Sequence, residues 1–440
     1  MIRKIIRNTY FDIIKMRKPT RTHIAVLLMV LLSISFHNHH AFAADSPPQI
    51  ISESAVLMDA KTGQVLYEKN MHMQLYPASI TKILTVLLGI ENSRLQDTIT
   101  MSHEAVFSVP RGSSNIALDE GEQITMEQAL MAAMLPSAND ASNGIAEQVS
   151  GSIENFARLM NQRAQEAGAL NSNFVNPHGL PHDAHISTAY DMAMITRAAI
   201  QNDKFRKIFG TVRYTIPPNN KQKESRDLWS EHRMLTTNRF YYEGVIGGKT
   251  GYTQASQNTL VTVAKRGERE LIVVVMKSQG YAVYNDTMAL FDYGFNQFTE
   301  TRIVPSVSVN PSRGEDESRT IQNILSQSKT TGITRLLHNA VNPKNVVVDY
   351  QLVDDKGRDL PDLKINIKLR TDSSLMYSDL GSVNISTASL KGSSDTQQGW
   401  TGIFFKIIKV LAFICLGLLV VLLMLRRYFK THRVVRKKRR

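Results

Sequence analysis

The chain has 440 residues, enough for two domains and targeting segments, and 42% of them are hydrophobic, which permits a full core. Its net charge of +13 lies at the two ends: residues 1–22 carry +6 and residues 426–440 carry +9, which leaves −2 for residues 23–425. Because contact with phosphates needs a basic face on the folded body, the sequence predicts no nucleic-acid partner.

Residues 1–43 have the layout of a secretory signal peptide. A basic region precedes the apolar run Ile24–Phe36, and Ala41-Phe42-Ala43 supplies a cleavage site of the small-x-small type. The apolar run has 13 residues, too few to span a bilayer comfortably. Met16 would begin a signal of ordinary length, so Met1 and Met16 both stay open as start sites.

Residues 44–299 are predicted to fold as one domain. In chain order, periodicity and turn residues predict strands at Ile51–Asp59 and Gln64–Lys69, helices from Ser79, over Met126–Leu135, after Asn139 and over Ile153–Ala167, strands at Asn258–Lys265 and Glu270–Lys277, and a helix near Tyr284–Phe298. The order strands, helices, strands, helix favours an α/β (α+β) fold in which helices pack on an antiparallel sheet.

The composition of the chain changes after Thr299. Residues 300–390 are predicted to form a small, mainly β domain with a loose polar insertion over Ser312–Thr331, and residues 391–402 a flexible linker. Strands are expected at Ile303–Val309, Val346–Leu352, Lys364–Leu369 and Gly381–Ser386.

Residues 403–425 are predicted to form a transmembrane helix. The stretch is 23 residues long and mostly apolar, and Lys406 and Lys409 lie near one end, where long side chains can reach the interface. The basic tail 426–440 predicts a cytoplasmic C-terminus, with the body of the protein outside the membrane. The only cysteine, Cys415, lies in this stretch, so no disulfide within the exported part is expected.

Ser79 and Lys82 are candidates for nucleophilic catalysis. They lie three positions apart at a predicted helix start and therefore share one helix face. A serine hydroxyl needs a base, and a lysine can serve only when burial or a second cation lowers its pKa from about 10.4 towards 7. The N-terminus of the helix also offers N–H groups to a developing oxyanion.

Two further motifs follow along the chain. Ser137-Ala138-Asn139 lies where Pro136 breaks a helix, a place from which side chains can point into a cleft. Lys249-Thr250-Gly251 precedes the second strand pair, where an edge strand could present a cation and a hydroxyl to a substrate carboxylate. Each motif also occurs a second time, so order and context carry the argument; the duplicates are Ser326-Gln327-Ser328-Lys329, Ser113-Ser114-Asn115 and Lys61-Thr62-Gly63.

In this order the three motifs resemble the signature of penicillin-recognising serine enzymes. Within that group the sequence is similar to the D-alanyl-D-alanine carboxypeptidases, the low-molecular-weight penicillin-binding proteins of peptidase family S11. The likeness covers residues 48–300 strongly, and the 300–390 region only loosely. It includes these segments besides the motifs: Met58–Gly63, Pro77–Ser79, Asn176–Pro181 and Gly247–Thr253.

The resemblance implies a role for each motif residue. Ser79 would be the acylated nucleophile, Lys82 its general base, and Ser137 a proton relay to the leaving group. The implied substrate-binding residues are Asn139 for the substrate amide, Lys249, Thr250 and Gly251 for the terminal carboxylate and its close approach, and the N–H groups of Ser79 and Tyr252 for the oxyanion. No metal or cofactor is implied. The implied partners are peptidoglycan stem peptides and, as covalent inhibitors, β-lactam antibiotics.

Other interpretations of three individual residues remain open. His178, with His182 and His185 close by, could indicate a Ser–His system or a metal site, although the resemblance implies a structural loop. Glu166 has one residue too many before Leu170-Asn171 to match the deacylating glutamate of class A β-lactamases, and Gly168 ends a helix more simply. Arg239 could assist carboxylate binding or be a solvated surface residue.

Two alternative functions remain beside the carboxypeptidase. A D,D-endopeptidase that cleaves cross-links would use the same acyl-enzyme. A wall-binding scaffold without turnover could keep the fold, although three intact motifs argue against it.

Overall fold

A computed structural model describes residues 46–236, 239–304, 315–328, 332–353, 361–369 and 379–387. The chain divides into two compact units, Met1–Pro48 and Gln49–Arg440, and nearly all described residues belong to the second. The predicted signal peptide, linker, transmembrane helix and basic tail lie outside the described residues. Within them, no helix is both long and apolar enough to cross a membrane.

A five-stranded antiparallel sheet forms the framework, with strand order β2-β1-β9-β8-β7. Its strands are β1 (Ser54–Asp59), β2 (Val65–Lys69), β7 (Val245–Thr253), β8 (Gln257–Arg266) and β9 (Arg269–Ser278). The antiparallel sheet and the two hairpins, β1–β2 and β8–β9, were both predicted. An edge strand was expected at Lys249-Thr250-Gly251, which lies in β7, but its bounds were not predicted because the glycines of β7 depart from the apolar, β-branched pattern.

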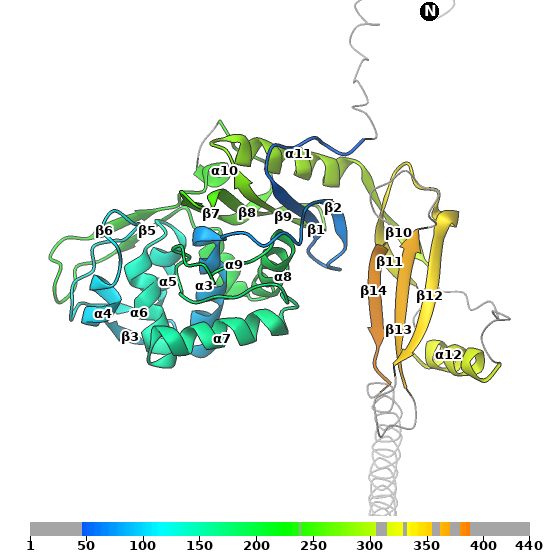
Figure 1. The fold of residues 1–440 in the computed structure, drawn as a ribbon, viewed down its shortest axis with the longest axis horizontal. Coiled ribbons are helices and arrows are strands. Elements are labelled where there is room, and N and C mark those ends of the chain that lie inside the picture. The colour runs from blue at the N-terminus through cyan, green and yellow to red at the C-terminus, as the bar shows by residue number, and fades with distance from the viewer. Residues whose placement is uncertain are drawn as a thin grey trace, which may run out of the picture. The chain divides into compact units, whose positions relative to one another are not determined.

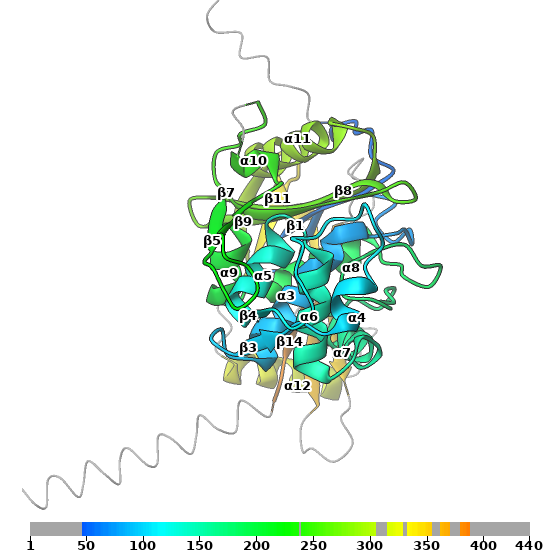
Figure 2. The same ribbon diagram turned by 90° about the vertical axis from the view of Figure 1, so that its left-hand side faces the viewer.

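Helices cover both faces of this sheet (Figures 1 and 2). Along β9, Leu271 and Val273 pack into one core, whereas Ile272 and Val274 pack into the other. Helix α11 (Ala282–Asn296) covers the first face, and α8 (Ala189–Ala199) contacts the second. Burial on both faces explains why β8 and β9 read as continuous apolar runs rather than alternating ones.

The helical region packs around α3 (Lys82–Asn92), which is buried over most of its length and follows the 3₁₀ helix η1 (Ala78–Thr81). The helix predicted over Met126–Leu135 begins at a capping box formed by Thr125 and Gln128. The other helices of this region are α4 (His103–Phe107), α5 (Met126–Met134), α6 (Asn139–Ser150), α7 (Ile153–Glu166) and α9 (Asp203–Phe209). Helix α10 (Arg233–Thr236) lies on the α11 face of the sheet (Figure 2), and its Met234 packs in the same core as Phe291.

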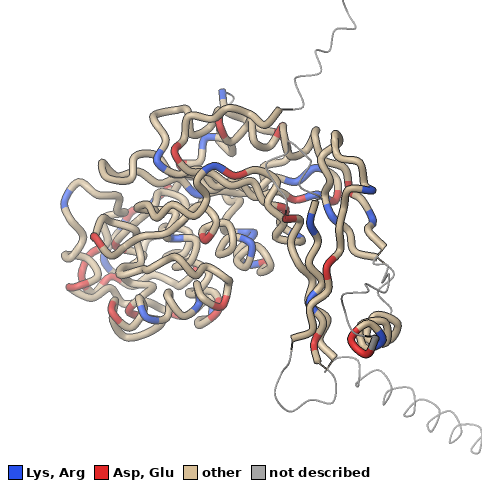
Figure 3. The backbone as a smooth tube through the Cα atoms, turned by 45° about the vertical axis from the view of Figure 1, so that its right-hand side comes forward, with Lys and Arg blue, Asp and Glu red and all other residues tan. Residues whose placement is uncertain are grey.

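Two short antiparallel strand pairs complete this part of the molecule. Strand β3 (Thr98–Thr100) pairs with β4 (Gln123–Thr125), and β5 (Arg213–Ile216) pairs with β6 (Arg226–Trp229). Acidic and basic residues are intermixed along the described backbone (Figure 3), in keeping with the near-neutral body of the sequence.

Most of the described residues after residue 297 lie in β-strands. Strand β10 (Phe298–Ile303) pairs with β11 (Ile333–His338), and β12 (Val346–Val353), β13 (Asp362–Leu369) and β14 (Asp379–Ile385) form a separate sheet. A 3₁₀ turn, η2 (Pro343–Asn345), precedes β12. These strands and one helix share an apolar core built on Ile365, Ile367 and Ile324.

Two expectations for this region need correction. The stretch expected to be a loose insertion contains α12 (Glu315–Gln327), whose buried Ile321 and Ile324 lie three residues apart on one face. Strand β10 ends at Ile303, where the predicted strand was to begin, because the pairing with β11 starts earlier. The domain boundary at residue 299 stays a prediction.

Candidate active site

The turn that carries Ser79 is held from several sides. Ala78, just before it, has a left-handed backbone with φ +52°. Thr259 on β8 donates its hydroxyl to the carbonyl of Pro77 at 2.9 Å. Gly179 passes so close that a Cβ there would overlap the Ala78 carbonyl oxygen. The position of the Ser79 hydroxyl therefore depends on the sheet and on a distant turn as well as on its own helix.

Lys82 is the centre of the polar network. It is fully buried at the start of α3. Its Nζ atom lies within hydrogen-bond distance of four oxygens: Ser79 Oγ at 3.1 Å, Ser137 Oγ at 3.4 Å, Asn139 Oδ1 at 2.7 Å and His178 O at 2.9 Å. The geometry thus brings together the first two predicted motifs around one amine.

The surroundings of Lys82 favour its neutral form. Burial, followed by the positive charge of Lys249, holds the pKa of Lys82 well below its usual value, and the carboxylates of Glu231 and Asp140 oppose this only in part. A neutral amine has a lone pair that can accept the proton of a neighbouring hydroxyl. The Lys82 amine is therefore suited to act as a base towards Ser79 or Ser137.

Ser137 and Asn139 are brought to the amine by the break between α5 and α6. Ser137 has a left-handed backbone with φ +64°, and the N–H of Ala138 turns back to donate to Ala132 O at 2.9 Å. Both side chains are almost completely buried. The break that Pro136 imposes on the helix thus directs both side chains inward, as the sequence pattern predicted.

Asp140 fixes the loop above the site to α6. Its carboxylate accepts hydrogen bonds from the backbone N–H groups of Ile116 and Leu118 at 3.1–3.3 Å and from that of Ala141 at 2.8 Å. Next to it, the N–H of Asn139 donates to the carbonyl of Ser114 at 2.9 Å. Burial raises the pKa of Asp140, and these N–H donors oppose that shift.

Lys249 is also buried, on the edge strand β7. Its Nζ donates to the carbonyl oxygen of Thr250 at 3.0 Å. Burial lowers the pKa of Lys249 to about 8, against the opposing charge of Glu231. Lys249 is therefore mostly cationic at neutral pH.

Gly251 lies where β7 approaches Ser79 most closely. A Cβ at this position would come 2.9 Å from the backbone nitrogen of Ser79 and would also crowd Thr259. The third residue of the Lys249-Thr250-Gly251 motif is therefore required to lack a side chain. Tyr252 follows on the same strand with its side chain 67% exposed.

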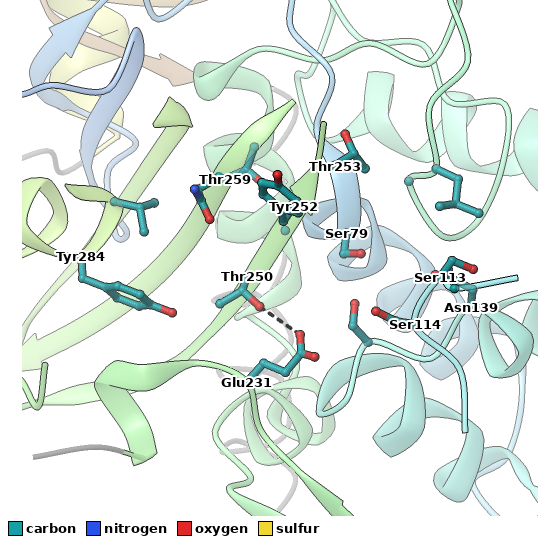
Figure 4. A pocket seen from close by; sticks show the side chains of 17 residues that line it. Ser79, Ser113, Ser114, Asn139, Glu231, Thr250, Tyr252, Thr253, Thr259 and Tyr284 are labelled. Carbon is teal, nitrogen blue, oxygen red and sulfur yellow. Dashed lines mark hydrogen bonds between the residues drawn. The ribbon is translucent and has the colours of Figure 1, made fainter. Parts of the chain in front are cut away.

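These residues surround a cleft of about 320 Å³, shown in Figure 4. Ser79 and Asn139 line it on one side, and Thr250 and Tyr252 on the other. Ser137 also lines the cleft. The remaining lining residues are Gly112, Ser113, Ser114, Gly179, Leu180, Glu231, Gly251, Thr253, Asn258, Thr259, Val283 and Tyr284. Lys82 and Lys249 lie behind this lining, in the protein interior.

The histidines near the site form structural contacts. The His178 carbonyl accepts from Lys82, and burial together with Lys82 holds the pKa of the His178 ring well below its usual value. Val175 N–H donates to Nδ1 of His185, so the Nε2–H of His185 donates to Thr81 Oγ1 at 2.9 Å. Among the described residues, no group of His, Cys, Asp or Glu is arranged to hold a metal ion.

The remaining sequence candidates lie in other contexts. Gly63 has φ +75° in the β1–β2 turn, and Gly168 has φ +88° after α7, so both glycines serve turns. The side chain of Arg239 lies over the rings of Phe240 and Tyr281 at 5.0 and 5.1 Å. Of the duplicate motifs, only Ser113-Ser114-Asn115 contributes to the cleft, through its two serines.

Sequence reasoning did not find Glu231 or Tyr284, which both line the cleft. Glu231 follows β6, and its Oε2 lies 3.4 Å from Thr250 Oγ1 (Figure 4). Tyr284 belongs to α11 and is stacked on Phe240, with ring centroids 4.8 Å apart. Neither residue belongs to a motif, and only the packing of α11 and the β6–α10 segment against β7 brings them to the site.

The family model for D-alanyl-D-alanine carboxypeptidase, peptidase S11, matches residues 41–280. The chain belongs to this family. The match includes Ser79, Ser137 and Lys249, the first residue of each motif around the cleft.

Curated members of the S11 family show the same relationship. D-alanyl-D-alanine carboxypeptidase DacF of Bacillus subtilis (strain 168) is 36% identical over 255 residues, covering 56% of this chain and 63% of the relative. DacC of Escherichia coli (strain K12) is 32% identical over 282 residues, covering 61% of this chain and 68% of the relative. The chain thus spans less than two thirds of the length of DacF.

Solved structures share the penicillin-binding-protein fold of the S11 chain. Penicillin-binding protein 5 from Haemophilus influenzae has a TM-score of 0.59 at 25% identity, covering 78% of this chain and 97% of that one. The Streptomyces K15 DD-transpeptidase has a TM-score of 0.54 at 28% identity, covering 57% of this chain and 99% of that one. A D-alanyl-D-alanine carboxypeptidase from Mycobacterium tuberculosis H37Rv has a TM-score of 0.52 at 28% identity, covering 58% and 94%.

Proposed function

We propose that the chain is a serine-type D-alanyl-D-alanine carboxypeptidase that removes the terminal D-alanine from peptidoglycan stem peptides through an acyl-enzyme on Ser79. One observation carries the proposal: the buried Lys82 amine lies 3.1 Å from Ser79 Oγ and 3.4 Å from Ser137 Oγ. A base within reach of two hydroxyls, one for attack and one for the leaving group, is what serine acyl transfer needs.

In the acylation step, neutral Lys82 takes the proton of Ser79 while Oγ attacks the carbonyl carbon of the penultimate D-alanine. The negative charge that develops on the carbonyl oxygen is stabilised by the N–H groups of Ser79 and Tyr252. The close approach of β7 at Gly251 supports this pairing, since a Cβ there would come 2.9 Å from Ser79 N.

The tetrahedral intermediate then collapses, and the bond to the nitrogen of the terminal D-alanine breaks. Ser137 donates its proton to that nitrogen and is reprotonated by Lys82, so D-alanine leaves as a neutral amine and Lys82 is neutral again. In deacylation, a water molecule gives a proton to Lys82 and attacks the ester. Proton return to Ser79 releases the shortened peptide with a free carboxylic acid.

Substrate binding is assigned to both walls of the cleft. Asn139 would hold the substrate amide, and Lys249 with Thr250 would bind the terminal carboxylate. The cationic form of Lys249 supplies the opposite charge for that carboxylate, with its pKa held at about 8 by burial. A β-lactam presents a carboxylate and an acylating carbonyl to the same groups, and would acylate Ser79.

The proposed site of action is the outer face of the cell membrane. The charge pattern supports this: a basic and apolar start over residues 1–43, and an apolar stretch at 403–425 followed by a tail of nine Lys/Arg residues. The catalytic part, 44–299, would work near the membrane, where stem peptides are assembled into the wall.

Labelling with a fluorescent penicillin tests the proposal most directly. Wild-type protein should be labelled covalently, whereas Ser79→Ala should not. Ser326→Ala, in the duplicate motif on α12, is the matched control and should be labelled like the wild type. Absence of labelling in the wild type would contradict the acyl-enzyme.

Peptide hydrolysis then separates the carboxypeptidase from its alternatives. Incubation with a peptide ending in D-Ala-D-Ala should release free D-alanine. A D,D-endopeptidase would instead open a cross-linked peptide dimer faster than it releases D-alanine. A protein that is labelled by penicillin but processes neither peptide would be a scaffold.

A further inference from the structure

Glu231 stands at one end of the cleft, beside Thr250. Its Oε2 atom lies 3.4 Å from Thr250 Oγ1, and Figure 4 shows the two side chains facing each other. The backbone N–H of Glu231 donates to Leu135 O at 3.2 Å, which ties this segment to the end of α5. The backbone of Glu231 is therefore held in place, and its water-exposed side chain lines the cleft.

Glu231 also dominates the charge of the cleft surface. Among the described residues that line the cleft, it is the only Asp, Glu, Lys or Arg. The two lysines of the site are buried behind the wall, and Nζ of Lys249 is bound to a backbone carbonyl. A group that enters at this end meets a carboxylate at the surface and a cation only behind it.

This arrangement is unfavourable for a leaving residue that carries only a negative charge. The hydroxyl of Thr250 is a proposed donor to the terminal carboxylate, and Glu231 competes for the same hydroxyl. Two carboxylates sharing one hydroxyl repel each other, which in a wet site weakens binding by about three- to tenfold. An ammonium group on the leaving residue would reverse the sign of this interaction.

We propose that Glu231 is a specificity-determining residue, which selects leaving residues bearing an ammonium group over residues such as D-alanine whose only charge is the carboxylate. The aromatic ring of Tyr284 lines the same cleft and adds a second group suited to an ammonium. The proposal rests on the proposed function, because it concerns the leaving residue of that reaction. The substrate class it adds is a peptide with a basic D-residue after the scissile bond.

The test compares three peptides that differ only at the last position: D-alanine, D-alanine amide and D-lysine. KM and kcat are measured for the wild type, for Glu231→Gln and for Glu268→Gln at about pH 6, well below the Lys249 pKa of about 8. At this pH Lys249 stays cationic even when loss of the Glu231 charge lowers its pKa. Glu268 is the matched control, an exposed glutamate in the β8–β9 turn that does not line the cleft.

Glu231→Gln should lower KM about three- to tenfold for the D-alanine peptide and raise it about as much for the D-lysine peptide. KM for the amide should stay within about twofold. Burial is the main cause of the lowered pKa of Lys82, and Ser79 keeps its hydrogen bond with Lys82, so kcat should change little and by the same factor for all three peptides. Glu268→Gln should behave like the wild type. Acylation by benzylpenicillin, an anion, should become faster in Glu231→Gln.

Two results would overturn the proposal for Glu231. One is an unchanged ratio between the D-alanine and D-lysine peptides in Glu231→Gln. The other is an equal change for all three peptides, which would indicate a purely structural effect. If the wild type is labelled by penicillin and releases D-alanine, such results contradict the role of Glu231 alone. A wild type that is not labelled and releases no D-alanine would instead contradict the proposed function.

Discussion

The two buried lysines of the cleft have contrasting surroundings. Nζ of Lys82 faces four oxygens from three separate chain segments, whereas Nζ of Lys249 is bound to one carbonyl of its own strand. Burial and the charge of Lys249 hold the pKa of Lys82 well below its usual value and favour the neutral amine, while Lys249, with a pKa of about 8, stays mostly cationic at neutral pH. In the proposed mechanism, the same residue type thus serves as a base at one position and as a counter-ion at the other. The difference lies in which lysine gives up its proton first.

Removing the Lys82 amine should have the largest effect of any change at the two lysines. Lys82→Met keeps an apolar stem but no base, so the rate of acylation by a fluorescent penicillin should fall by about 10³-fold or more. Stopped-flow or quenched labelling measures this rate. Lys265→Met, at an exposed position near the end of β8, is the control and should acylate normally. A loss of less than about tenfold would remove Lys82 from the role of base.

Gly251→Ala should disturb the point where the two walls meet. The added Cβ would lie 2.9 Å from Ser79 N and would crowd Thr259, so the oxyanion site would be displaced. Acylation should slow by about 10²-fold, because small displacements of reacting groups are costly. Gly267→Ala, in a turn with open space around it, should acylate at the wild-type rate. Equal behaviour of the two variants would show that the close approach at Gly251 is not needed.

Loss of the Lys249 proton should weaken binding of the substrate carboxylate. Because its pKa is about 8, KM for a peptide ending in D-Ala-D-Ala should rise as pH increases through about 8. Lys249→Met should raise KM about tenfold at neutral pH and abolish this dependence. Initial rates over a pH series provide the measurement. A dependence that persists in Lys249→Met would have to come from another group.

Deprotonation of Lys249 should weaken substrate binding but increase the stability of the folded chain. The pKa of Lys249 is about 8 in the folded chain and near 10.5 when unfolded, so the unfolded chain binds more protons between these values. The cost of burying the cation is therefore fully present below pH 8, and it is relieved as pH rises through that window. Compared with Lys249→Met, the wild type should gain in unfolding free energy over this range in a denaturant titration.

Asp140→Asn should have the smallest effect. The amide can still accept hydrogen bonds from Ile116 and Leu118, but without the charge, which should cost about 1 kcal/mol in the free energy of unfolding. Thermal unfolding measures the loss. The loop that carries Ser114 should loosen, and acylation should slow by about two- to threefold. A change as large as that of Lys82→Met would mean that the loop, and not the amine, limits the reaction.

The sequence predicted those parts of the fold and site that depend on local pattern. Ser79 and Lys82 share a helix face because they lie three positions apart. Pro136 prevents α5 from continuing, because proline has no backbone N–H to donate within a helix. The contact of Lys82 with Ser137 could not be predicted, since 55 residues separate them and the approach needs a left-handed Ser137. Glu231 was missed for a similar reason, because it reaches the cleft only through pairing across the fold.

In the region after residue 297, elements with a clear residue pattern were also predicted, whereas an element that depends on packing against a distant segment was not. Strands β12 and β13 have β-branched or alternating apolar patterns and were predicted within about two residues of their ends. Helix α12 was missed because most of its residues are polar, and its few isoleucines matter only once a sheet is there to cover them. Local pattern indicates an element, but its partner decides whether the element forms.

The left-handed backbones of Ala78 and Ser137, at the proposed catalytic hydroxyls, have a consequence for how this protein could evolve. Ala78 and Ser137 each hold a backbone conformation that costs an L-residue about 1–2 kcal/mol, and each adjoins or is a proposed participant in the chemistry. Glycine at position 78 would relieve that cost and raise thermal stability, but it would also let the Ser79 turn sample other arrangements. Selection for robustness and selection for turnover therefore act in opposite directions at this position.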